Sequence, residues 1–287
     1  RPVDVHMFRA DLFSDAQVDA VSLLVGPSQV TAAPFTTSNE SDVTPTSHDR
    51  SRPMPDTWRH LFGSDNARVP DVGQASDPLR LGDFATIKRG VATGANWFFV
   101  LTDELRREHK LPATVLQPML RRLRDHPGAV LTSAALERLP TRETRWLFVC
   151  PPRQNRNRAA TKYISLGEES GVDKGVLCAE RSVWYDLSHE VHIADVIVGP
   201  STKGEFRFVE NLAGAPITNN LYGMSWRPDV GTETQTALLD WLRSPAGQRE
   251  IARVARSQGS GLLKVEPRAL SQLQLPASIT AEVAAQA

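Results

Sequence analysis

The sequence has little cysteine, which limits the kinds of site that it can hold. Its 287 residues include two cysteines, Cys150 and Cys178, and these lie too far apart in the chain for a zinc-binding pattern. A single pair of cysteines also provides no disulfide framework, so a reducing compartment is the natural interpretation. We therefore expect neither a metal site nor structural disulfides.

Long apolar runs are also missing. No apolar stretch approaches the roughly 18 residues that would cross a bilayer, and the amino-terminal residues lack the apolar core of a signal peptide. These features predict a cytoplasmic protein that contacts no membrane. Hydrophobic residues make up 40% of the chain, which is enough for one large or two modest domains with apolar cores.

An excess of charge of either sign is absent, because 33 Lys and Arg balance 33 Asp and Glu. This balance favours an α+β interaction module without a nucleic-acid role. The charges are distributed unevenly, however, since residues 117–164 hold 10 Lys and Arg against 3 Asp and Glu. A basic stretch can follow phosphates, and Arg153, Arg156 and Arg158 are the candidate contacts. A solvated helix face and loop would explain the same arginines.

Short apolar runs separated by turn residues predict a mixed α+β fold. Strands are expected at residues 5–8, 18–25, 145–149, 192–198, 205–209 and 217–226. Helices are expected at residues 102–110, 159–169, 233–243 and 246–257, and Leu116, Leu120 and Leu123 recur at helical spacing. Residues 31–77 are rich in Thr, Ser, Pro, Asn and Asp in their first half, so a linker or long loop is expected there.

The stretch 86–101 is expected to form a strand, a special turn and a second strand. Gly90 and Gly94 would let the backbone take positive φ and present Thr93 and Asn96 at the surface. The apolar residues from Trp97 onward would anchor the turn, and Lys88 before it would be available to a phosphate. An ordinary hairpin is the simpler alternative.

Two later stretches share this mixture of glycine and short polar residues. In residues 214–224, Thr218, Asn219 and Asn220 interrupt an apolar strand, and each needs a partner because an unpaired buried polar group costs on the order of 1–3 kcal/mol. The partner is either the protein's own backbone or DNA. In residues 258–267, Gly259 and Gly261 precede Lys264 and suggest a phosphate-cradling turn, although a helix stop needs no ligand.

In this order, the three stretches resemble the DNA target-recognition region of TaqI-like adenine-N6 DNA methyltransferases of restriction–modification systems. The first matches G-x-x-T-G-x-N-x-x-F, the third matches G-x-G-x-x-K, and residues 181–185 match R-x-x-W-Y, with Trp184 expected in the core. The resemblance implies double-stranded DNA as partner, with contacts from Lys88, Thr93, Gly94, Asn96, Arg153, Arg156, Arg158, Lys203, Thr218, Asn219, Asn220, Gly259, Gly261 and Lys264.

The resemblance extends to the amino-terminal strands, where Phe13 and Val18 match F-x-x-x-x-V. In that family the aromatic residue stacks on the adenine once it has been flipped from the duplex. Residues 1–30 would then be the terminal β-hairpin of a methyltransferase catalytic domain, 31–77 a linker, and 78–287 an α+β recognition domain with a helical carboxyl-terminal part.

Two motifs of such enzymes are missing from the sequence. It contains neither the glycine-rich S-adenosylmethionine loop nor Asn-Pro-Pro-Tyr. We therefore expect no catalytic residue here and no methyl-donor binding by this chain alone, whereas the complete enzyme would use S-adenosylmethionine and act at the nucleoid. The missing catalytic portion would be part of the same polypeptide or a partner chain. A non-catalytic specificity subunit is the alternative that these absences favour.

Overall fold

The computed structural model describes residues 3–8, 20–25, 35–39, 46–48, 79–139, 145–154, 157–258, 260–276 and 279. The protein is α+β, as the sequence predicts. It divides into two compact units, of which one comprises Arg1–Asp77 with Arg256–Lys264 and the other Pro78–Ala255 with Val265–Ala287. None of the helices in the described ranges is both long and apolar enough to cross a membrane.

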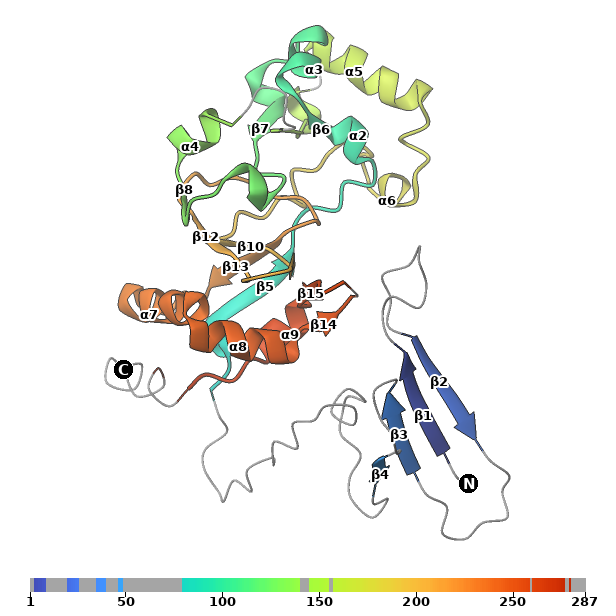
Figure 1. Ribbon diagram of the computed structural model, residues 1–287. Coiled ribbons are helices and arrows are strands. Elements are labelled where there is room, and N and C mark those ends of the chain that lie inside the picture. The colour runs from blue at the N-terminus through green and yellow to red at the C-terminus, as the bar shows by residue number, and fades with distance from the viewer. Residues whose placement is uncertain are drawn as a thin grey trace. The chain divides into compact units, whose positions relative to one another are not determined.

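The first unit contains a four-stranded sheet in the order β2-β1-β3-β4 (Figure 1). Its strands are β1 (Val3–Phe8), β2 (Ala20–Val25), β3 (Phe35–Asn39) and β4 (Thr46–His48). The predicted pairing of the first two strands is confirmed, since β1 and β2 are antiparallel. Strand β3 is parallel to β1 and buries Thr37 opposite Val5. The expectation that residues 31–77 form only a linker is therefore wrong for β3 and β4, because backbone pairing does not require an apolar sequence pattern.

A short hairpin in the same unit joins β14 (Arg256–Ser257) to β15 (Leu263–Lys264). Its turn takes left-handed backbone at Ser260, with φ of 48°, and at Gly261, with φ of 72°. The stretch 258–264 is thus a hairpin turn rather than a helix stop. The preceding helix ends at Val254, three residues before the expected end, because residues 256–257 pair as a strand.

The second unit is built on a five-stranded sheet in the order β5-β13-β10-β12-β8. Neighbouring strands are antiparallel except for the parallel pair of β12 and β8. The strands are β5 (Ala85–Arg89), β8 (Val130–Leu131), β10 (Val196–Val198), β12 (Phe208–Asn211) and β13 (Tyr222–Trp226). The last three are shorter than the predicted strands, and β11 (Ser201–Thr202) follows β10.

Helices at the carboxyl-terminal side of the chain group together beside this sheet (Figure 1). They are α7 (Thr232–Arg243), α8 (Pro245–Val254) and α9 (Pro267–Ser271), with α1 (Leu81–Phe84) nearby. The predicted break between α7 and α8 is confirmed. Ser244 caps α8 by accepting a hydrogen bond from the Gly247 amide at 3.2 Å, and Pro245 occupies the first helical position.

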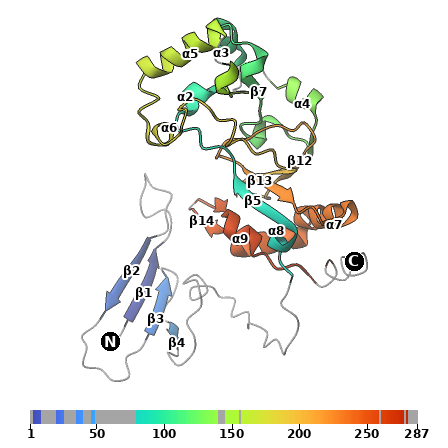
Figure 2. The ribbon, with the colours of Figure 1, turned by 180° about the vertical axis from the view of Figure 1, so that it is seen from behind.

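In both views, a group of helices and short strands lies across the five-stranded sheet from α7, α8 and α9, and it encloses a hydrophobic core (Figure 2). It surrounds the three-stranded sheet β6-β9-β7, and its centre is the aromatic cluster of Phe98, Phe99, Phe148 and Tyr163. Its elements are α2 (Asn96–Phe99), β6 (Val100–Leu101), α3 (Asp103–Glu108), β7 (Leu116–Pro118), β9 (Trp146–Phe148), α5 (Arg158–Glu169) and α6 (Val176–Ala179), with short 3-10 turns at Ala113–Val115 and Pro152–Gln154. Helix α4 (Ser133–Glu137) and the 3-10 turn Leu123–Asp125 pack instead in a separate cluster with Ile197 and Val209 of the five-stranded sheet.

Several predictions for this core are confirmed. The helices expected at 102–110 and 159–169 are α3 and α5, and the residue that begins the first, Thr102, caps it by accepting a hydrogen bond from the Leu105 amide at 3.2 Å. Asn157, which the sequence did not single out, caps α5 by accepting hydrogen bonds from the Ala159 and Ala160 amides. The strand expected at 145–149 is β9, and Trp184 packs against the core.

Two predictions are wrong in this core. Leu116, Leu120 and Leu123 do not share a helix, because Leu116 lies in β7 and Pro118 removes the amide hydrogen that a helix would need. The stretch 86–101 is not a hairpin either. Strand β5 belongs to the five-stranded sheet, residues 96–99 form α2, and β6 belongs to the three-stranded sheet.

Candidate nucleic-acid interface

The first two glycine-containing stretches meet at the end of β5. The Val91 amide donates to the Ile217 carbonyl at 2.9 Å, the Gly90 amide to the Leu221 carbonyl at 3.0 Å, and the Asn219 amide to the Val91 carbonyl at 3.0 Å. Residues more than one hundred positions apart therefore form one backbone network. Because these bonds use only main-chain atoms, they fix the two loops independently of their side chains.

Gly90 permits this close approach. A Cβ at residue 90 would lie 2.4 Å from the Ile217 carbonyl oxygen and 2.5 Å from that of Thr218. Real Cβ atoms do not approach backbone oxygen so closely, so the position requires glycine for space. The expectation of positive φ holds for Gly94, with φ of 82°, but not for Gly90.

The first turn is held together by its own polar side chains. Thr93 is 2% exposed, and its hydroxyl donates to the Asn96 side-chain oxygen at 2.8 Å and accepts from the Ala95 amide at 3.2 Å. The expectation that Thr93 lies at the surface is therefore wrong, because its hydroxyl is used to close the turn. Asn96 is half-buried, and Gly94 is exposed.

Arg181 holds the same turn from the inside. Its guanidinium donates to the Ala92 carbonyl at 2.9 Å and to the Thr93 carbonyl at 3.0 Å, and it forms an ion pair with Glu190. Burial alone would lower the pKa of Arg181, but the hydrogen bond and charge of Glu190 outweigh this effect, so the pKa of Arg181 is raised. The neighbouring thiol of Cys178 is buried, which raises its pKa despite the opposing effect of Arg181. In the sequence, Arg181 is visible only as a basic residue close to two aromatic residues, and this pattern does not predict its structural role.

The second turn separates one buried residue from two exposed ones. Thr218 is 1% exposed, and its hydroxyl has no hydrogen-bond partner among the described residues. The Leu221 amide closes the turn on the Thr218 carbonyl at 3.0 Å, and Asn219 and Asn220 are exposed. The predicted strand at 217–226 therefore begins only at Tyr222, and burial of Thr218 removes it from direct contact with a ligand.

A hollow of about 390 Å³ lies beside this junction, on the face of the sheet where Lys88 and Gly223 pair. Its polar lining consists of Thr86, Lys88, Arg89, His192 and Ser225. The Lys88 side chain is exposed and forms no hydrogen bond or ion pair within the described ranges. It is therefore available to an anion, whereas Thr86, His192 and Ser225 were not singled out by the sequence.

The second basic residue that lines this hollow, Arg89, already has an acidic partner. Arg89 forms an ion pair with Glu266 at 2.7 Å, which raises the pKa of the guanidinium. The Tyr222 hydroxyl donates to the same carboxylate at 3.3 Å, and burial together with Glu266 raises the pKa of Tyr222 to about 12. An adjoining hollow of about 350 Å³ shares Ile193 with the first, so the depression continues along the surface.

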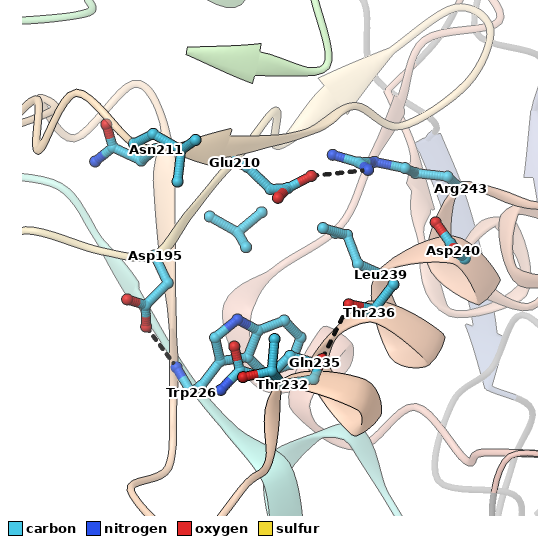
Figure 3. A pocket seen from close by; sticks show the side chains of 12 residues that line it. Asp195, Glu210, Asn211, Trp226, Thr232, Gln235, Thr236, Leu239, Asp240 and Arg243 are labelled. Carbon is cyan, nitrogen blue, oxygen red and sulfur yellow. Dashed lines mark hydrogen bonds and ion pairs between the residues drawn. The ribbon is translucent and has the colours of Figure 1, made fainter. Parts of the chain in front are cut away.

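A hollow of different character lies between α7 and the sheet (Figure 3). It has a volume of about 250 Å³, and its charged lining consists of three carboxylates and the guanidinium of Arg243, which pairs with Glu210 at 3.2 Å. Asp195 accepts a hydrogen bond from the Trp226 amide at 2.8 Å (Figure 3). This acidic lining disfavours phosphate, so the basic hollow is the better candidate.

Three other predicted residues of the second unit lie on other elements. Arg153 is exposed in a 3-10 turn before α5, Arg158 is exposed at the start of α5, and Lys203 is exposed in the turn after β11. Gly261 and Lys264 belong to the hairpin of the first unit. Phe13, Arg156 and Gly259 lie outside the described residues. Within the described ranges, no group of three His, Cys, Asp or Glu is placed to hold a metal ion.

Most of the chain matches the model of a known protein family. Residues 58–287 match the model of the C-terminal domain of the type II methyltransferase M.Eco57I. The chain is 24% identical over 190 residues, 66% of its length, to the type II methyltransferase M.AccI of Acinetobacter calcoaceticus. It spans only 35% of that relative.

Two solved structures were also compared with the whole chain. The type IIG restriction endonuclease BpuSI is 17% identical with a TM-score of 0.49, covering 96% of this chain and 36% of that enzyme. The type IIL restriction-modification enzyme MmeI, in complex with DNA, is 13% identical with a TM-score of 0.39, covering 96% of this chain and 34% of that enzyme. Both scores lie below 0.5, so the fold assignment rests on the structure itself.

Proposed function

Because the chain belongs to the family of the M.Eco57I methyltransferase C-terminal domain, we propose that it recognises the double-stranded DNA target of a restriction–modification methyltransferase. The observation that carries the proposal is the main-chain junction of two distant loops. It presents exposed Asn219 and Asn220 close to the strand of Lys88, whose side chain is exposed and has no ion-pair partner among the described residues. Phosphate contacts position a protein on DNA, and base contacts select the sequence. The junction supplies side chains of both kinds.

For the complete enzyme we propose transfer of a methyl group from S-adenosylmethionine to the N6 nitrogen of a flipped adenine. We place the donor site in the remaining catalytic portion, since this chain lacks the donor loop and Asn-Pro-Pro-Tyr. Phe13 is proposed to stack on the flipped adenine, as the resemblance implies. Thr93 and Thr218 are proposed to support the recognition turns from within, while Asn96, Asn219 and Asn220 face the DNA.

Lys88→Ala tests the phosphate contact. We expect the mutant to bind duplex DNA more weakly at low salt and with the magnitude of its logarithmic salt slope reduced by about 1, because one fewer counterion is released. Binding is measured by fluorescence anisotropy of a labelled duplex over a series of salt concentrations. Lys110→Ala, which removes another exposed lysine that is not among the predicted DNA contacts, is the matched control. Equal salt slopes for Lys88→Ala and the wild type would contradict the role of Lys88.

Asn219→Ala and Asn220→Ala test base recognition. Each is expected to reduce discrimination between the cognate site and one-base mismatches by up to about 1–3 kcal/mol, since asparagine forms a bidentate pair with adenine. Stability should change by less than about 0.5 kcal/mol, because both side chains are exposed. Methylation of matched and mismatched duplexes by the complete enzyme measures the first quantity, and thermal melting the second.

Thr218→Val is the control for this second turn. It removes a buried hydroxyl without a described partner at nearly constant volume, so stability should be maintained or raised. Site preference should also be maintained, because the side chain is buried. An asparagine mutant that melts several degrees lower yet keeps its site preference would place that asparagine in the structure rather than in recognition.

A further inference from the structure

Trp97 leaves most of its side chain in solvent. It is 62% exposed, whereas the next two residues, Phe98 and Phe99, are 1% and 0% exposed. The sequence predicts that the apolar run beginning at Trp97 anchors the turn, and this is wrong for its first member. The helical turn α2 sends the two phenylalanines into the core and leaves the indole outside.

The backbone that carries Trp97 is held rigidly. Phe98 packs edge-on against Phe99 at 5.0 Å and stacks on Tyr163 at 4.6 Å between ring centroids. On the other side of the tryptophan, the Thr93–Asn96 hydrogen bond and the Arg181 contacts fix the turn. An exposed aromatic on such a support loses little conformational entropy when it binds a ligand.

Other exposed apolar residues lie close to the turn that precedes Trp97. Val176 and Leu177, which begin α6, are 75% and 43% exposed, and a Cβ at Gly94 would lie 3.1 Å from Leu177 Cβ. The same loop is hydrogen-bonded through Val91 to the Asn219 turn, and Lys88 precedes it on β5. The exposed indole therefore follows a turn that is hydrogen-bonded to the loop of Asn219 and Asn220 and preceded by the strand of Lys88.

We propose that Trp97 inserts as an apolar wedge between two neighbouring bases of the DNA bound at this junction, partly unstacks that step and stacks on one of the bases. This inference rests on the proposed function and adds a base-contacting residue to it. An indole face accepts any base, so the contact would strengthen binding without selecting a sequence. Because the ring is uncharged, stacking releases no counterion and its contribution does not depend on salt.

Trp97→Ala in the full 287-residue chain tests the inference against a labelled mixed-sequence duplex. We expect affinity to fall by about 5-fold or more, since unstacking of the base step offsets part of the stacking energy, with an unchanged logarithmic salt slope. Trp97→Phe should keep most of the affinity, because it retains a ring. Leu212→Ala, which truncates a 70% exposed residue beside the acidic hollow, should bind like the wild type. Thermal melting of every variant checks that the fold is retained.

The possible outcomes separate this inference from the function on which it rests. A wild-type chain that does not bind DNA at low salt refutes both. Wild-type binding that Trp97→Ala leaves unchanged overturns the role of Trp97 alone and leaves the proposed function standing. A Trp97→Ala mutant whose affinity and salt slope fall together also overturns stacking, since phosphate contacts would then have moved.

Discussion

Gly90→Ala is expected to lower the free energy of unfolding by about 3 kcal/mol or more, at or above the upper end of the usual cost of overpacking. The added Cβ would meet the carbonyl oxygens of Ile217 and Thr218 at 2.4 and 2.5 Å. Both are main-chain atoms, so no flexible side chain can move aside. The loop containing residues 217–221 must shift, and its hydrogen bonds to Gly90 and Val91 must lengthen.

Thermal and urea denaturation measure the loss, which corresponds to a melting temperature lower by roughly 6–12 °C for a unit of this size. Gly204→Ala is the matched control, because no atom lies within 4 Å of a Cβ there and the backbone is not left-handed. Replacing that glycine should leave stability unchanged or raise it by up to about 1 kcal/mol through the unfolded chain. Equal stabilities of the two variants would show that the junction is looser than its hydrogen bonds indicate.

Arg181→Ala is expected to destabilise the protein by about 3 kcal/mol, the lower end of the range for breaking a buried ion pair. The guanidinium side chain is 9% exposed, but Glu190 is 38% exposed and regains part of its hydration when left alone. The Ala92 and Thr93 carbonyls also lose their donors. The first turn should loosen, so DNA affinity should fall even where the remaining fold survives.

A double mutant separates the two components of this cost. Arg181→Met with Glu190→Gln removes the unpaired charge, so the stability that remains missing measures the lost bonds to the two carbonyls. Arg253→Ala is the control for removing a surface arginine, since its ion pair with Glu250 is exposed and worth at most about 1 kcal/mol. Complete recovery of stability and DNA affinity in the double mutant would refute a role for Arg181 in shaping the turn.

The sequence predicts best the elements whose signals are local. The Thr102 cap locates the start of α3, the Ser244-Pro245 break separates α7 from α8, and α5 begins within a residue of the predicted position. Alternating apolar residues likewise predict β1 and β2. These patterns depend on interactions between residues close in the chain, so they do not need the tertiary structure.

The errors arise where distant partners decide the structure. Nothing in residues 31–77 indicates that β3 would pair with β1, because the pairing is made by the backbone. Thr93 and Thr218 are of a polar residue type that is mostly exposed in proteins, yet both are buried by packing at the junction. Gly90 was predicted for its conformational freedom, whereas its missing side chain provides space for a loop from another part of the chain.

The main-chain character of the loop junction has a consequence for the divergence of related enzymes. The turn at residues 219–220 is closed by the Thr218 carbonyl and tied to β5 through the Asn219 amide, so its shape is independent of the two exposed side chains. Mutations at these two positions would change which chemical groups face the outside at little cost in folding free energy. We expect these positions to vary freely among relatives with different preferences, while glycine persists at position 90. Under the proposed function, such an arrangement would let new specificities arise by single substitutions on a constant framework.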